Sequence, residues 1–163
     1  MAITIILTLS LLGLAVAFFY SFSVQKISID MGIDDAGTRK RLATIHKAIA
    51  SGAMAFLKQE YKFMAIFMVV FAMIIAVLID DHHTDYVNEG FYTAIAFIFG
   101  AVISIASGFI GMRIATQGNV RTTVSANKSL SEAFNVALHS GSVMGFALVS
   151  LASLGMLLIY LLL

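Results

Sequence analysis

The stretch GAVISIASGFIGMRIATQGNVR, residues 100–121, predicts the class of the whole fold. It begins as an apolar helix with Gly100, Ser104 and Gly108 at every fourth position, and in hydrocarbon small residues at this spacing let a neighbouring helix approach closely. Arg113 is the first charge after a long uncharged run, so it marks the point where the helix reaches the membrane interface. We therefore expect a membrane helix that packs against protein and leads into a polar loop. The alternative is a lipid-facing helix whose glycines are incidental.

The composition is typical of an integral membrane protein. Hydrophobic residues make up 60% of the chain and charged residues 12%, with a mean hydropathy of +0.97, whereas soluble domains are about half apolar and about a quarter charged. The chain has no Cys, which excludes disulfides, thiolate metal sites and cysteine catalysis. It also has no Pro, so we expect helices without proline kinks.

Uncharged apolar runs predict four membrane spans. The first run, from Ala2 to Gln25, is long enough to cross a hydrocarbon core of about 30 Å. The first is expected to be a retained span and not a cleaved signal peptide, since no Lys or Arg precedes it. One long helix is expected from Thr38, its candidate N-terminal cap, to Ile79, and Ser129–Glu132 fits a capping box that opens the fourth helix. The spans are expected at about 2–24, 63–79, 91–112 and 140–163, with loops at about 25–62, 80–90 and 113–132.

The basic residues predict the orientation of these spans. All ten Lys and Arg lie between Lys26 and Lys62 or between Arg113 and Lys128, two segments that share one side of a four-span chain. By the positive-inside rule, the loops at 25–62 and 113–132 are expected in the cytoplasm. Both termini and the 80–90 loop, which carry no Lys or Arg, are expected outside.

Residues for catalysis or metal binding do not fall into a recognisable motif. There is no Gly-rich phosphate loop, no Ser-His-Asp arrangement, and no Asp, Glu or Lys within a predicted span. A metal site at His82 and His83 is disfavoured against a solvated loop, because adjacent loop residues seldom converge on one ion. His139 is expected to be a hydrogen-bonded structural residue, with a proton relay as the alternative. Gly141 and Gly145 provide a second small-residue pair for helix packing.

Three segments carry a family resemblance. Residues 52–62 read GAMAFLKQEYK, residues 100–122 continue the stretch quoted above to Thr122, and residues 141–145 read GSVMG. In this order and spacing they resemble the GAxAFLxxEYK, GAxxSxxxGxxGMxxAxxxNxRT and GxVMG segments of membrane-bound inorganic pyrophosphatases, the pyrophosphate-energised proton or sodium pumps. The resemblance runs from about residue 37 to the end of the chain.

The resemblance implies an all-α, polytopic bundle of about sixteen transmembrane helices in two concentric rings, in which this chain forms the first four, in the outer ring. It also implies a hydrolase and ion translocase, which couples Mg²⁺-dependent pyrophosphate hydrolysis to outward transport of protons or sodium ions. The ligands for Mg²⁺ belong to later helices, so no catalytic or metal-binding residue is carried over to this chain. The pumped ion and any K⁺ requirement are left open.

Motif positions and partners also follow from the resemblance. Glu60, Lys62, Arg113, Asn119 and Arg121 match motif positions and are assigned to ordering the cytoplasmic loops. For Arg113, Asn119 and Arg121 the alternative is a direct electrostatic attraction of pyrophosphate. The implied partners are the remaining helices of the same protein, the lipid bilayer and a second copy in a homodimer, with no nucleic acid. The implied location is an integral, multi-pass membrane position, in the cell membrane if the source is prokaryotic.

We therefore expect a fragment: the N-terminal segment of an ion-pumping pyrophosphatase, inactive by itself. The apolar ending LLIYLLL, residues 157–163, favours a truncated or split product. The alternative is an independent, non-catalytic four-helix membrane protein that acts by helix docking. A small channel or transporter is disfavoured, because no charged residue lies within a predicted span.

Overall fold

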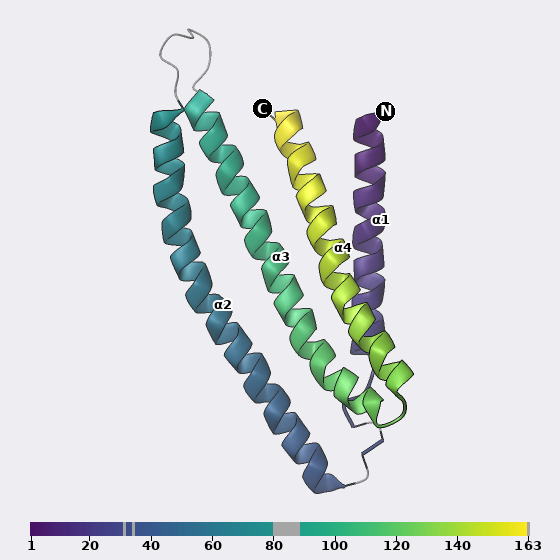
Figure 1. Ribbon diagram of the computed structural model, residues 1–163. Helices are drawn as coiled ribbons and strands as arrows, with labels where there is room; N and C mark the ends of the chain where they lie inside the picture. The colour runs from purple at the N-terminus through teal and green to yellow at the C-terminus, as the bar shows by residue number, and fades with distance from the viewer. Residues whose placement is uncertain (31, 34, 80–88, 163) are drawn as a thin grey trace.

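The chain folds into four long helices. The computed structural model describes residues 1–30, 32–33, 35–79 and 89–162. In chain order the helices are α1 (Ala2–Gln25), α2 (Ala36–Leu78), α3 (Glu89–Ala126) and α4 (Leu130–Leu162) (Figure 1). Each is long and apolar enough to cross a membrane, and the described residues contain no strand. The prediction of an all-α transmembrane bundle is confirmed.

Three of the helices are longer than a bilayer requires. At about 1.5 Å per residue, the 24 residues of α1 span about 36 Å, close to a hydrocarbon core of about 30 Å. By the same measure α2, with 43 residues, spans about 65 Å and α3, with 38 residues, about 57 Å. Both chain ends lie at the same end of the bundle as the start of α3, so α2 and α3 project beyond α1 at the opposite end (Figure 1).

The start of α2 differs from the prediction in its cap. Asp35, and not Thr38, is the N-terminal cap: its carboxylate accepts hydrogen bonds from Gly37 N at 3.2 Å and Thr38 N at 2.8 Å. The Thr38 hydroxyl also donates to this carboxylate, at 2.6 Å. These bonds, led by the one from the Thr38 hydroxyl, hold the pKa of Asp35 below its ordinary value. The helix then runs unbroken to Leu78, which confirms one long helix in this part of the chain.

The polar segment after Arg113 is helical, which corrects the prediction of a loop at 113–132. α3 continues to Ala126, so only residues 127–129 connect it to α4. The helix accommodates both kinds of polar side chain there: Arg113 and Asn119 are exposed, whereas Thr116 and Ser125 are buried against neighbouring helices. At the start of α4, the Ser129 hydroxyl accepts a hydrogen bond from Glu132 N at 3.1 Å, as in a capping box. The 80–90 loop lies outside the described residues except for Glu89 and Gly90, which begin α3.

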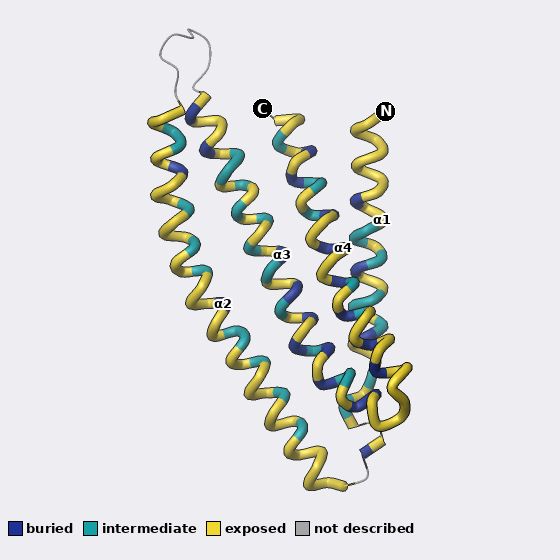
Figure 2. Tube along the Cα trace, in the orientation of Figure 1, coloured by how far each residue is buried: buried dark blue, intermediate teal, exposed yellow. Residues whose placement is uncertain are grey.

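The helices form a row rather than a closed bundle. α4 packs against both α3 and α1, while α2 packs against α3 and, among the described residues, against no other helix. The order across the row is therefore α2, α3, α4, α1 (Figure 1). One cluster of buried hydrophobic residues joins α1, α3 and α4: Ala17, Ile114, Val143 and Ala147, with Tyr20 packed against them. Figure 2 shows most buried positions on α3 and α4, whereas α2 has only two among its residues, Leu57 and Ala72.

Small residues permit the close approach of neighbouring helices in this row. A Cβ atom added at Gly118 of α3 would lie 2.7 Å from the Ser140 Cβ of α4, a separation that real side chains do not adopt. At Gly155 of α4, an added Cβ would collide with the Ile103 side chain of α3. Gly13 makes the corresponding close approach between α1 and α4.

The glycines singled out in the sequence occupy different positions. Gly100, Gly141 and Gly145 are exposed, with no described atom within 4 Å of an added Cβ, and Ser104 is exposed as well. Gly108 alone among them faces a neighbour, the Tyr61 hydroxyl of α2 at 3.4 Å. Gly100 and Ser104 border a hollow between α3 and α4. Helix packing at the four exposed positions therefore stays a prediction.

We expect Gly118→Ala to destabilise the chain by about 1–3 kcal/mol, because its new methyl group overlaps the buried Ser140 side chain. Gly145→Ala is the matched control, and it should be neutral or stabilising by up to about 1 kcal/mol, since alanine favours helix and the site is open. Thermal unfolding in detergent, followed by circular dichroism, measures both. Equal unfolding temperatures for the two variants would contradict the close approach.

Candidate functional site

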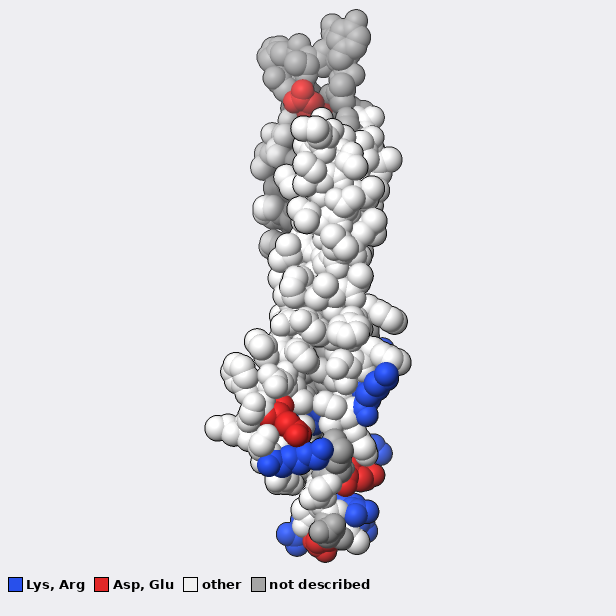
Figure 3. All heavy atoms as spheres, turned by 90° about the vertical axis from the view of Figure 1, so that its right-hand side faces the viewer, with Lys and Arg blue, Asp and Glu red and all other residues white. Residues whose placement is uncertain are grey.

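Positive charge gathers at one end of the molecule. All ten Lys and Arg lie within residues 26–62 and 113–128, and these segments form the lower end of the row in Figure 1. Figure 3 shows the blue side chains confined to this half of the visible face. We call this the basic end. The five residues singled out for an ordering role, Glu60, Lys62, Arg113, Asn119 and Arg121, all belong to these two segments.

Arg121 joins α3 to the end of α1. Its guanidinium donates from Nε to the carbonyl of Ile27 at 3.1 Å and from Nη2 to the carbonyl of Gln25 at 3.3 Å. A third bond, from Nη1, reaches the carbonyl of Gln117 on α3 at 3.0 Å. The last carbonyls of a helix lack partners within it and carry partial negative charge, so a cation with several donors suits them. Arg121 thus fastens the segment after α1 to α3.

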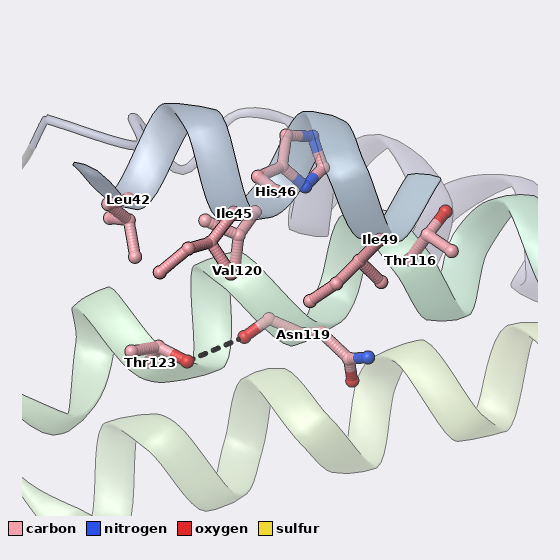
Figure 4. Close-up of a pocket in the computed structure, with 8 residues that line it drawn as sticks. All are labelled: Leu42, Ile45, His46, Ile49, Thr116, Asn119, Val120 and Thr123. Carbon is pink, nitrogen blue, oxygen red and sulfur yellow. Dashed lines mark hydrogen bonds between the residues drawn. The ribbon is translucent and has the colours of Figure 1, made fainter. Parts of the chain in front are cut away.

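Arg113 and Asn119 have no comparable contact. Both are exposed on α3, and Arg113 borders a groove beside α1. Asn119 lines a hollow between α3 and the first turns of α2, and its carbonyl accepts a hydrogen bond from the Thr123 hydroxyl at 3.0 Å (Figure 4). The structure therefore gives only Arg121 direct bonds to another segment among these three residues.

The hollow between α2 and α3 is small and mainly apolar. Its volume is about 70 Å³, and Leu42, Ile45 and Ile49 line it from α2 (Figure 4). His46 supplies an imidazole, but no carboxylate and no Lys or Arg lines the hollow. This lining suits a water molecule better than a phosphate or a metal ion.

Glu60 and Lys62 flank the residue that contacts α3. Both are exposed on α2, while the Tyr61 hydroxyl between them donates to the Ile105 carbonyl of α3 at 3.0 Å. Leu57, one helical turn earlier, is buried. The sequence analysis did not select Tyr61, because it considered only the charged residues Glu60 and Lys62 beside it. The signal was the four-residue spacing of Leu57 and Tyr61, which places both on one helix face.

His139 makes an aromatic contact. Its ring stacks on Tyr20 of α1, with 4.5 Å between ring centroids and an interplanar angle of 11°. The described residues include no hydrogen bond from the His139 side chain, so ring packing takes the place of the hydrogen bond that was predicted. This contact adds to the pairing of α1 with α4.

The part of the chain that the structure describes shows no metal centre. It contains no group of three or more His, Asp or Glu side chains that could hold an ion. The disfavoured site at His82 and His83 lies outside the described residues. The basic end therefore offers bonds that order segments and a cationic surface, and it does not offer an acid, base or nucleophile arranged for catalysis within those residues.

Comparison with known proteins finds relatives along most of the chain. The family described as "Inorganic H+ pyrophosphatase" matches residues 11–163. The chain is 38% identical over 145 residues to the K(+)-insensitive pyrophosphate-energized proton pump 2 of Moorella thermoacetica, covering 89% of this chain and 19% of that protein. It is 40% identical over 124 residues to the K(+)-stimulated pyrophosphate-energized sodium pump of Thermotoga maritima, covering 75% of this chain and 16% of that protein.

A third relative is also matched over about a fifth of its length. It is the K(+)-insensitive pyrophosphate-energized proton pump of Methanosarcina mazei, 35% identical over 152 residues, which cover 93% of this chain and 20% of the relative. The chain thus spans about a fifth of the length of the curated relatives it matches. No solved structure matches the chain.

Replacing Arg121 by Met should release the segment after α1, because the three bonds of the guanidinium are lost while its aliphatic bulk is kept. Hydrogen bonds to charged groups contribute about 1.5–3 kcal/mol each at most, so we expect a loss of stability of about this size. Hydrogen exchange should quicken at residues 24–28. Arg41→Met, on an exposed part of α2, is the control. Unchanged exchange in Arg121→Met would contradict the role assigned to this residue.

Proposed function

The chain belongs to the inorganic H⁺ pyrophosphatase family, and from this premise we propose that it forms the N-terminal membrane segment of an ion-pumping pyrophosphatase. The observation that carries the proposal is the match of residues 11–163 to the family, on a structure with four helices that could each cross a membrane. The chain is accordingly an integral, multi-pass membrane protein. In the proposed pump, Mg²⁺-dependent pyrophosphate hydrolysis drives protons or sodium ions outward.

The relatives limit how specific the proposed function can be. Proteins named as proton pumps and as sodium pumps both match, as do K(+)-insensitive and K(+)-stimulated ones. The proposal therefore extends to a pyrophosphate-energised cation pump and does not choose the ion. Mg²⁺ would be held by residues beyond those described here, because the described residues bring no three acidic or imidazole side chains together.

Within such a pump, the four helices would act as a docking scaffold. Large apolar side chains are exposed on every helix, among them Phe18, Phe67 and Met156, and a row of helices leaves both of its faces open. The exposed small residues Gly100 and Gly141 would let a further helix come close. The partners proposed are the remaining helices of the same protein, surrounding lipid and a second copy. The alternative function, an independent docking protein, would use the same surfaces.

The ordering role would belong to the basic end. Arg121 holds the segment after α1, and Tyr61 joins the middle of α2 to the Ile105 carbonyl in the apolar part of α3, next to the charged turns of α2. These contacts support a role in positioning the cytoplasmic part of the pump. Glu60, Lys62, Arg113 and Asn119, which are exposed, would contact parts of the protein beyond these helices or the aqueous phase.

We propose that the basic end faces the cytoplasm, which single cysteines can test because the chain has none of its own. In intact spheroplasts, a membrane-impermeant maleimide should label Glu89→Cys at the start of α3. It should label Lys128→Cys, in the turn before α4, only after permeabilisation. The reverse labelling pattern would overturn the orientation.

We expect the 163-residue chain alone to release no phosphate from pyrophosphate above background in the presence of Mg²⁺. The physical reason is the absence, among the described residues, of a cluster able to hold the metal ion that activates the phosphoryl group. The measurement is a colorimetric phosphate assay on purified, reconstituted chain. The full-length Thermotoga maritima pump serves as the positive control. Turnover by the isolated chain would contradict the proposal that this chain is inactive by itself.

A further inference from the structure

A groove opens near the basic end, between α1 and α3. Ser21 and Gln25 line it from α1, Arg113 and Gln117 line it from α3, and Val143 of α4 completes the lining. Its volume is about 230 Å³. Two helices that are distant in the sequence, α1 and α3, thus bring four polar side chains to one place, beside apolar side chains.

The groove lies where the apolar spans end. α1 carries no charged residue from Ala2 to Gln25, and α3 carries none from Gly90 to Met112. The latter run has a length of about 35 Å at about 1.5 Å per residue, which matches the hydrocarbon core. Arg113 therefore lies at the depth of the lipid phosphates, while the apolar lining, such as Phe109 one turn earlier, faces the acyl chains.

The polar side of the groove is rich in hydrogen-bond donors. Gln25 Nε2 donates to Ser21 Oγ at 3.0 Å, which leaves the hydroxyl hydrogen of Ser21 for an oxygen atom in the groove. The Arg113 side chain is exposed, and within the described part of the chain it forms no ion pair or hydrogen bond. No carboxylate lines the groove. An oxyanion is the ligand that such donors bind best.

Gln117 adds a hydrogen-bond acceptor to these donors. Its Oε1 atom is buried and accepts no hydrogen bond from the described residues. Its backbone carbonyl is already bonded to Arg121, which fixes the position of this residue on α3. A buried amide oxygen without a donor is unfavourable, so a ligand that carries a hydroxyl group would satisfy it after a small rotation of the amide.

We propose that this groove binds the headgroup of an anionic glycerophospholipid. The phosphate lies against Arg113 and Ser21, a headgroup hydroxyl donates to Gln117, and an acyl chain follows Phe109 into the membrane. Basic pockets between transmembrane helices commonly recognise anionic headgroups in this way. The proposal depends on the membrane placement of the four helices and not on pyrophosphate hydrolysis, so it can fail or hold independently of the pump.

Native mass spectrometry of the detergent-solubilised 163-residue chain, titrated with phosphatidylglycerol, tests the proposal. One lipid should bind tightly to the wild type, and Arg113→Gln should weaken that binding roughly five- to tenfold, the effect of one interfacial charge. Arg41→Gln, which removes an exposed arginine from the basic end outside the groove, should stay within about twofold of the wild type. Arg113→Lys should bind better than Arg113→Gln, because it keeps the charge.

Several results would overturn the proposal. Equal binding by the wild type and Arg113→Gln would remove Arg113 from the site, and equal binding of neutral diacylglycerol would exclude phosphate recognition. Displacement of the lipid by inorganic phosphate or pyrophosphate at similar concentrations would show a site for free phosphate instead. Variants are compared only if their helical content equals that of the wild type.

If Arg113→Gln fails to fold, Gln117→Leu provides the second test. This change keeps the volume and removes the unpartnered acceptor. It should reduce the preference for phosphatidylglycerol over phosphatidic acid, whose headgroup carries no glycerol hydroxyl. An unchanged preference would overturn the proposal in its stated form, since Gln117 would then not contact the headgroup.

Discussion

Hydrocarbon offers no hydrogen-bond partner to a peptide group, and the rest of this structure depends on that constraint. Each span must satisfy its backbone within its own helix, and charged side chains are unfavourable inside the hydrocarbon core. The chain meets both demands with four helices and places every Lys and Arg beyond the spans, at one end. The extra length of α2 and α3 is consequently found at that end, where polar side chains can be solvated (Figure 1).

Association of the helices then rests on close approach and on a few polar contacts, because lipid is as apolar as the side chains themselves. Gly118 and Gly155 bring α3 and α4 together, and Gly13 does the same for α1 and α4. At the basic end Arg121 adds bonds from α3 to the last residue of α1 and to the segment after it, whereas α1 and α3 themselves pack only slightly against each other. Helix packing within the spans and the hydrogen bonds of Arg121 at the basic end therefore both stabilise the row of helices.

The sequence predicts the class of this fold well, because uncharged runs and basic segments are local properties. The long helix ending at Leu78 and the cap at Ser129 follow from the same local reasoning. The choice of packing glycines does not follow, since several positions on a helix carry small residues and only the neighbour decides which are covered. Gly118 lies within the segment that was predicted as a loop, so its contact with Ser140 could not be anticipated.

The pairing of α1 with α4 has a consequence for how the chain is made. Of the four helices α1 is the first to be synthesised, yet its main partner, α4, is the last. The face of α1 that meets α4 carries Gly13 and Ala17, small apolar residues that lipid can cover in the meantime. α4 is thus inserted between α3 and α1, which are already in the membrane. Its insertion forms both of its helix contacts at once and completes the row.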